Sequence, residues 1–231
     1  MAEKITNLKN KCVLYENSDD DAEEDTGEDC GLALDKLNLG PRKKLLVLGL
    51  GGLLCHRVYH RVKSNIPVYR RHDASYGSFL VYKRPHCEEF MKFCFDRFEV
   101  AVWSSARGCF RHRTNDCLGY LMHQDECTDS GFKTLENMKK TIFLKDFKQI
   151  RNSGVQHSAS NTLFIDDKPY TALLNPPHTA IFPEEYNVDQ VHDAASGPRG
   201  DLRMYLDGLA DAVDVPSYVK EHPFGHNTDT L

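Results

Sequence analysis

Residues 162–169 have the sequence TLFIDDKP, in which a short apolar run stops abruptly at two adjacent carboxylates. Runs of the same kind occupy residues 45–48 (LLVL) and 100–103 (VAVW), and they too stop at glycine or polar residues. Each run is continuously apolar rather than alternating, which is typical of a β-strand that is covered on both faces. The three runs therefore predict strands in the middle of a sheet.

Helical patterns follow two of these runs, at residues 87–97 and 201–213. Alternating strands and helices predict an α/β fold with a parallel sheet flanked by helices. The carboxyl ends of parallel strands meet at one edge of the sheet, so the polar residues after the three runs are predicted to share one crevice. Residues 57–84 mix basic and apolar residues with turn signals at 65–67 and 76–78, which predicts a small inserted β flap.

The 231-residue chain has an ordinary globular composition, with 40% hydrophobic and 27% charged residues. Its length suits one compact domain with a tail. No apolar run approaches the roughly 18 residues that a membrane span needs, so no span is expected. Residues 41–231 hold 23 acidic and 25 basic side chains, a balance that does not favour direct binding of nucleic acid.

Residues 1–40 differ from the rest in charge, with 11 acidic and 4 basic side chains. Eight of the eleven residues 19–29 are acidic, and this density of like charge predicts a disordered acidic arm. Such an arm either docks a basic partner or only keeps the chain soluble. It argues against a mitochondrial presequence, which would be rich in arginine and poor in acids. We expect an arm at 1–40, a domain at 41–226 and a tail at 227–231.

The cysteines are interpreted as reduced thiols, because the sequence shows no signal peptide and is too large and apolar to depend on disulfides. They lack any CxxC pair, so most of them are expected to be small buried apolar residues. A zinc site built from Cys55, His56 and His60 stays open as an alternative. The eight are Cys12, Cys30, Cys55, Cys87, Cys94, Cys109, Cys117 and Cys127.

The polar residues that follow the runs are candidates for phosphate chemistry. Asp166 and Asp167 are adjacent carboxylates, and a hard divalent cation such as magnesium would offset their repulsion. Ser104 and Ser105 could hold a phosphate oxygen, and Lys145 could neutralise its charge. Taken singly, each feature also fits a plain alternative, namely a solvated turn, a helix cap or an exposed lysine.

The first run ends at Gly49-Leu50-Gly51-Gly52, so the carboxylate that a phosphoryl-transfer site on this framework needs is missing. A dinucleotide-binding loop is a weaker interpretation of these glycines. The GxGxxG fingerprint would require glycine where Leu54 stands, and no P-loop lysine follows.

Several ordered motifs resemble the FCP/SCP-like phosphatases, the family of the NLI-interacting-factor domain within the haloacid-dehalogenase (HAD) superfamily. The resemblance covers about residues 43–225 and is strongest to plant-type members. The family includes phosphatases that act on the carboxy-terminal domain of RNA polymerase II, and a receptor subunit of the mitochondrial import translocase. The motifs are LLVLGLGGLLCHR at 45–57, KRPHCEEFMKFCF at 83–95, VWSSA at 102–106, QDECTDSGFK at 124–133, FLKDF at 143–147 and NTLFIDDKPYTALLNPPHTAIFP at 161–183.

The resemblance implies a HAD-like fold and a role for each matching residue. Ser104 matches the residue that binds the phosphoryl group, Lys145 the lysine that steadies the charged intermediate, and Asp166 and Asp167 the pair that holds magnesium. In the family pattern DxDx(T/V), the first aspartate attacks phosphorus to form an aspartyl-phosphate and the second acts as general acid and base. The two remaining roles fall on positions 49 and 51.

Those two positions are Gly49 and Gly51 in this chain. Some plant-type members have asparagine at the second position, so Gly49 is the more serious departure. Glycine has no side chain to act as a nucleophile, and losing a nucleophile commonly costs about a million-fold in rate. Magnesium should also bind more weakly without this ligand. A second departure is the short stretch between Trp103 and Gln124, where a family strand would be reduced to residues 118–122.

The resemblance implies a protein serine/threonine phosphatase domain with magnesium as its cofactor and a phosphoprotein or phosphopeptide as its partner, and the glycines at 49 and 51 predict that its catalysis is impaired and its magnesium binding weakened. A non-catalytic phosphopeptide- or protein-binding module and an import-receptor-like component are the alternatives. The basic stretch of the flap, which begins at Arg57, either recognises a phosphorylated or acidic peptide or is merely solvated. We expect a soluble nuclear or cytoplasmic protein, with a mitochondrial location disfavoured.

Overall fold

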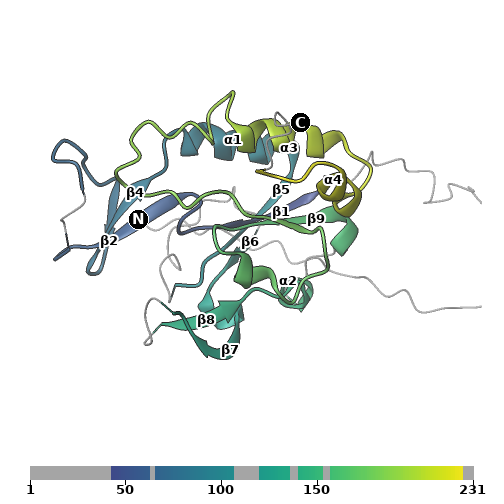
Figure 1. The fold of residues 1–231 in the computed structure, drawn as a ribbon, viewed down its shortest axis with the longest axis horizontal. Helices are drawn as coiled ribbons and strands as arrows, with labels where there is room; N and C mark the ends of the chain where they lie inside the picture. Colours follow the sequence, from purple (N-terminus) through teal and green to yellow (C-terminus); the bar gives the residue numbers. More distant parts are fainter. Residues whose placement is uncertain (1–42, 63–65, 107–119, 136–139, 153–156, 226–231) are drawn as a thin grey trace, which may run out of the picture. The chain divides into compact units, whose positions relative to one another are not determined.

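A five-stranded parallel sheet forms the centre of the computed structural model, which describes residues 43–62, 66–106, 120–135, 140–152 and 157–225 (Figure 1). The strand order is β10-β9-β1-β5-β6, and the neighbouring pairs are parallel. The three apolar runs are confirmed as its central strands. The strands are β1 (Leu45–Gly49), β5 (Glu99–Trp103), β6 (Tyr120–Met122), β9 (Thr162–Ile165) and β10 (Ala180–Ile181).

Helices flank the sheet on both faces, which confirms the predicted α/β class. α1, α3 and α4 lie on one face, and α2 lies on the other with the hairpin of β7 and β8 (Figure 1). The helices are α1 (Cys87–Arg97), α2 (Phe147–Asn152), α3 (Asp201–Asp211) and α4 (Val215–Glu221), and the short 3-10 turns are η2 (Gln124–Glu126), η3 (Ala159–Asn161) and η4 (Pro169–Ala172).

β1 shows why the runs are continuously apolar. Leu46 and Leu48 pack into the cluster under α1, α3 and α4, whereas Leu45 and Val47 pack into the cluster with α2 and Trp103. All four of these β1 side chains are fully buried. Because successive strand residues point to opposite faces, a strand with two covered faces needs an apolar residue at every position.

The predicted flap is a three-stranded antiparallel sheet in the order β2-β4-β3. Arg84, just after β4, anchors it: Arg84 donates two hydrogen bonds to the carboxylate of Asp193, each 2.8 Å long, and a third of 3.3 Å to the carbonyl of Leu53. The pair with Asp193 fixes the flap to the segment between β10 and α3, and the hydrogen bond to Leu53 ties it to the loop that follows β1. The strands of the flap are β2 (Cys55–Tyr59), β3 (Ala74–Tyr76) and β4 (Phe79–Lys83).

The short segment before Gln124 still supplies a strand. β6 is three residues long and pairs in parallel with β5, while residues 107–119 lie outside the described part of the chain. Beyond β6, β7 (Thr128–Lys133) and β8 (Thr141–Leu144) form an antiparallel hairpin. The expected arm at 1–40 and tail at 227–231 also lie outside the described residues.

Two smaller expectations concern the cysteines and the membrane. The described cysteines, Cys55, Cys87, Cys94 and Cys127, are free thiols. Within the described ranges, the helices are all too short or too polar to cross a bilayer.

Candidate functional site

The adjacent strands β9, β1 and β5 bring distant residues together at their carboxyl ends. Gly49, the last residue of β1, is level with Trp103 of β5, and Leu48 is level with Ile165 of β9. A crevice of about 460 Å³ opens at this edge. Six of the candidate residues line it, namely Gly51, Ser104, Ser105, Lys145, Asp166 and Asp167, whereas Gly49 is buried and is not among its lining residues.

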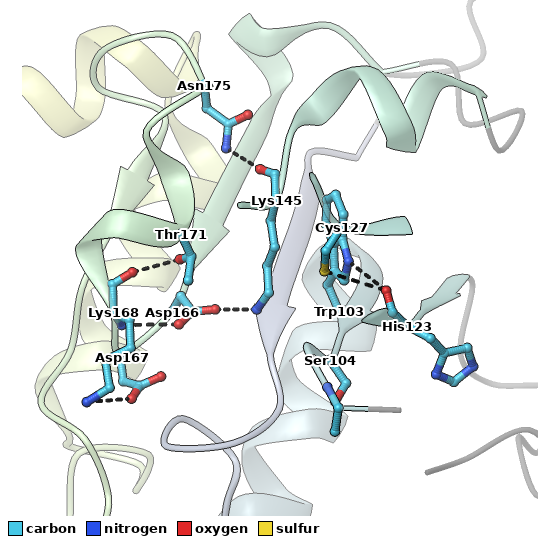
Figure 2. Close-up of polar contacts among 11 residues, drawn as sticks. Trp103, Ser104, His123, Cys127, Lys145, Asp166, Asp167, Lys168, Thr171 and Asn175 are labelled. Atoms are coloured by element: carbon cyan, nitrogen blue, oxygen red, sulfur yellow. Dashed lines mark hydrogen bonds and ion pairs between the residues drawn. The ribbon is translucent and has the colours of Figure 1, made fainter. Parts of the chain in front are cut away.

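Lys145 and Asp166 form a buried ion pair in the floor of this crevice, with only 4% of each side chain exposed. The Lys145 backbone is held on both sides, because its N–H donates to the Thr171 carbonyl at 2.7 Å and its carbonyl accepts from Asn175 Nδ2 at 2.9 Å. Figure 2 shows its side chain running from Asn175 toward Asp166. Lys145 is therefore a pre-positioned cation whose charge is already paired.

The side chain of Asp166 takes the place that a residue 49 side chain would need. A Cβ built on Gly49 would lie 2.8 Å from Asp166 Oδ2 and 3.0 Å from Asp166 Cγ, closer than real Cβ contacts. Asp166 thus covers Gly49. As long as Asp166 stays paired with Lys145, there is no room at position 49 for a carboxylate side chain.

The next two glycines face different surroundings. A Cβ on Gly51 would meet no atom within 4 Å, so this position opens into space at the crevice. Gly52 has φ +79°, and a Cβ there would overlap with the carboxylate of Asp167. The glycine at 52 is required by its left-handed backbone and by the close approach of Asp167.

Asp167 is a buried carboxylate whose side chain is 6% exposed. Burial raises the pKa of Asp167 to about 7, and the charge of Asp166 adds to the rise. The ammonium of Lys168 lies 3.4 Å from Asp167 and donates to Glu185 at 2.6 Å. Although burial alone would lower the pKa of Lys168, Glu185 and Asp167 raise it, so Lys168 stays charged at the rim of the crevice.

Ser104 and Ser105 lie on the opposite side of β1 from Asp166. Ser104 is buried, its N–H donates to the Met122 carbonyl at 2.9 Å, and its hydroxyl oxygen accepts from the N–H of Ala106 at 3.2 Å. Because the oxygen acts as an acceptor, the hydroxyl proton is left to donate into the crevice. Ser105 is exposed at the rim.

The flap and the β7–β8 hairpin form the walls of the crevice. Arg57, Phe79 and His56 line it from the flap, and Lys140 and Phe143 line it from the hairpin. Arg57 also lies over the ring of Phe79, with its guanidinium carbon 5.8 Å from the ring centre. Both walls therefore combine cationic and aromatic side chains.

The basic stretch of the flap is divided between two surfaces. Arg57 lines the crevice, whereas Arg70 pairs with Asp73 and donates to the Lys83 carbonyl, where it lines a separate pocket beside the start of α1. Residues such as Lys140, Glu185 and Tyr170 line the crevice although the sequence did not point to them. They carry no local signal, because only the hairpin and the turns after β9 bring them there.

The zinc alternative finds no support among the described residues. The thiol of Cys55 bonds to the Leu50 carbonyl, His56 Nδ1 lies 3.2 Å from the Tyr186 carbonyl, and His60 Nδ1 lies 3.0 Å from the Ser78 carbonyl. Across the described part of the chain, no three His, Cys, Asp or Glu side chains are grouped so that they could hold a metal ion.

The magnesium implied by the resemblance would have to be held by Asp166 and Asp167. Both oxygens of Asp166 are engaged, Oδ2 with Lys145 and Oδ1 with the N–H of Lys168 at 3.1 Å. Mg²⁺ needs a near-octahedral set of oxygen ligands, and Asp166 Oδ2 already holds the ammonium of Lys145, a like-charged competitor for the same oxygen. As these side chains lie, they do not fit a bound magnesium ion.

Comparison with known proteins identifies the family. The sequence profile described as NLI interacting factor-like phosphatase matches residues 44–216. A relative from Schizosaccharomyces pombe (strain 972 / ATCC 24843), "Uncharacterized protein C2F7.02c", is 25% identical over 174 residues, which are 75% of this chain and 50% of that protein. The chain thus spans about half the length of that relative.

Two solved structures are similar at low identity. One is Fcp1, described as an essential RNA polymerase II CTD phosphatase, with 14% identity, a TM-score of 0.42, and coverage of 84% of this chain and 58% of that one. The other is fission yeast RNA polymerase II CTD phosphatase Fcp1 bound to beryllium fluoride, with 12% identity, a TM-score of 0.37, and coverage of 81% and 56%. Since the profile covers well over half of the sequence, the chain belongs to the NLI interacting factor-like phosphatase family.

Proposed function

We propose that this phosphatase-family domain binds phosphorylated serine or threonine segments of proteins and does not hydrolyse them. The single observation that carries the proposal is Gly49, which stands at the end of β1 where the family pattern has its attacking aspartate, buried beneath Asp166. Covalent catalysis through a carboxylate needs an oxygen at that point, and backbone atoms cannot replace it.

The remaining carboxylates of the crevice are poor substitutes for the missing nucleophile. Asp166 is paired with Lys145 and accepts from the N–H of Lys168, and these two contacts stabilise its charge and make it a weaker nucleophile. Asp167 is buried, and its pKa of about 7 means that a large share of the molecules carry it protonated near neutral pH. The chain therefore lacks a ready nucleophile among the crevice acids that the structure describes.

The features that support phosphate binding are intact. Ser104 supplies a hydroxyl, Lys145 supplies an ammonium group, and both reach the floor of the crevice. Arg57 and Lys140 add charge from the two walls, and Phe79, Phe143 and Tyr170 supply aromatic surface for the residues beside a phosphorylated side chain. The arrangement suits an extended phosphopeptide better than a free nucleotide, since no glycine-rich dinucleotide loop is present at 49–54.

The decisive experiment is turnover of an aryl phosphate with magnesium present, comparing the native chain with Gly49→Asp and with Gly49→Asp/Gly51→Asp. We expect no turnover by the native chain and no phosphorylated protein after acid quench. Measurable turnover by the native chain that equals turnover by the double variant would overturn the proposal. Trapping a phosphorylated adduct on any residue of the crevice would overturn it as well.

Binding is tested separately in a fluorescence polarisation assay, with a labelled phosphoserine peptide and the same peptide without the phosphate. The phosphorylated peptide should bind at least about tenfold tighter, which corresponds to about 1.4 kcal/mol. Ser104→Ala should weaken that preference, whereas Lys148→Met, an exposed change on α2, should leave it unchanged. Equal binding of both peptides would favour a general protein-docking module.

The placement in the plant-type subgroup and the nuclear or cytoplasmic location stay predictions from the sequence. The import-receptor-like alternative has no feature in the described residues that favours it over phosphopeptide binding.

A further inference from the structure

We propose that this crevice binds phosphate groups without a divalent metal ion, with Lys145 serving as its resident cation. The inference rests on the proposed binding function and adds the chemistry by which the site works. It starts from the observation that the ammonium of Lys145 is paired with Asp166, one of the two carboxylates that the family resemblance assigns to the metal (Figure 2).

Formal charge supports this inference. The crevice is lined by four cationic side chains, Arg57, Lys140, Lys145 and Lys168, and by three acids, Asp166, Asp167 and Glu185. The formal charge of these seven side chains is therefore +1. With two further carboxylates at positions 49 and 51 the formal charge would be −1, and a divalent cation would bring it back to +1. A chain that lacks both the two carboxylates and the metal ion thus presents the same net charge to a phosphate dianion.

Geometry points the same way as charge. The ammonium of Lys145 has three N–H donors and donates one of them to Asp166. The other two can donate to an oxygen of a ligand in the crevice. The hydroxyl of Ser104 lies across the end of β1 from Asp166, and because its oxygen accepts from the N–H of Ala106, its proton is available to a phosphate oxygen. Gly51 lines the same crevice and has no atom within 4 Å of its would-be Cβ, so the crevice is open for a tetrahedral group at this residue.

The two carboxylates that remain have protein partners of their own. Asp166 is satisfied by Lys145 and by the N–H of Lys168, and Asp167 lies against the Lys168 ammonium. A magnesium ion would have to displace the buried Lys145 ammonium from Asp166 and leave that charge without its partner, which is strongly unfavourable. The ion pair and the metal are therefore competing occupants of the same carboxylate.

The test measures binding of O-phosphoserine to the full chain by phosphorus NMR, first with EDTA and then with millimolar magnesium chloride. We expect the dissociation constant to differ by less than about twofold between the two conditions, because no ligand set for the metal is free. Binding that appears only with magnesium would overturn the inference while leaving the proposed function standing. No binding in either condition would overturn both.

Direct metal binding gives an independent measurement. Mn²⁺, followed by electron paramagnetic resonance, should remain free in the presence of the native chain at millimolar concentration. The Gly49→Asp/Gly51→Asp variant, which adds two carboxylates, should bind Mn²⁺ and should need magnesium for O-phosphoserine binding. Tight Mn²⁺ binding by the native chain would contradict the proposal.

Lys145 is tested with a pair of variants because removing it alone strands a buried carboxylate. The double variant Lys145→Met/Asp166→Asn removes both charges, and its new side chains are similar in size to the old ones. We therefore expect its circular dichroism spectrum to match that of the native chain. O-phosphoserine binding should then fall by at least about tenfold, since charge-assisted hydrogen bonds are the strong ones at such a site. The control Lys148→Met should bind as the native chain does, and unchanged binding by the folded double variant would refute the role of Lys145.

Discussion

The carboxylate of Asp166 lies where a side chain on Gly49 would begin, so that a Cβ on Gly49 would come 2.8 Å from Asp166 Oδ2. The glycine at position 49 and the Lys145–Asp166 pair are therefore one structural feature, because the side chain of Asp166 occupies the room that a residue 49 side chain would take. Introducing an aspartate at 49 means rearranging Asp166 as well as adding an oxygen.

Substitutions at Gly49 should destabilise the fold, and aspartate should do so more than alanine. Gly49→Ala should lower the free energy of unfolding by about 1–3 kcal/mol, the usual cost of overpacking a buried position. Gly49→Asp should cost more, because a second carboxylate beside Asp166 adds like-charge repulsion. Urea denaturation measures both, and the gap between the variants should narrow at acidic pH as the carboxylates are protonated. If both variants unfolded at the same urea concentration as the native chain, Asp166 would not cover Gly49.

The two glycines that follow should respond in opposite ways. Gly51→Ala should change the free energy of unfolding by less than about 0.5 kcal/mol, since its Cβ meets open space. Gly52→Ala should cost at least about 1–3 kcal/mol for the left-handed backbone alone, and the crowding against Asp167 adds to this. Thermal melting of the two variants side by side checks the contrast, and equal melting temperatures would contradict it.

Asp167 should make the fold less stable as pH rises. Its folded-state pKa of about 7 lies above the ordinary value of 3.8, so between these pH values the folded chain keeps a proton that the unfolded chain releases. The free energy of unfolding should therefore fall as pH rises through this range and level off above the folded-state pKa. Asp167→Asn should flatten the profile, whereas Asn at the exposed Asp189 should leave it unchanged. A profile that Asp167→Asn does not alter would disprove the assignment.

Arg84 should be far more important to stability than its neighbour Lys83. Arg84→Met breaks a buried, two-point ion pair with Asp193 and should cost about 3–5 kcal/mol. Lys83→Met removes an exposed pair with Glu88 and should cost less than about 1 kcal/mol. Chemical denaturation measures the difference. If the two variants lost similar stability, the flap would not depend on the Arg84 anchor.

Element positions were predictable where the signal is local. The helix expected at 87–97 matches α1 at both ends, because its apolar residues recur with helical spacing. The helix expected at 201–213 ends earlier, at Asp211, since Ala212 is already extended. Lys44 donates to the carbonyls of Ala210 and Ala212, a contact across the sheet that no local pattern contains.

The sequence by itself determined the three central strands, two of the helices, the family and the absence of carboxylates at Gly49 and Gly51, because apolar periodicity and motif residues are properties of short segments. Only the tertiary structure decided that Asp166 turns to Lys145 and covers Gly49, and that burial shifts the pKa of Asp167. Side-chain direction and desolvation depend on which strands pair and what packs over them, and these contacts join residues that lie up to about a hundred positions apart in the chain.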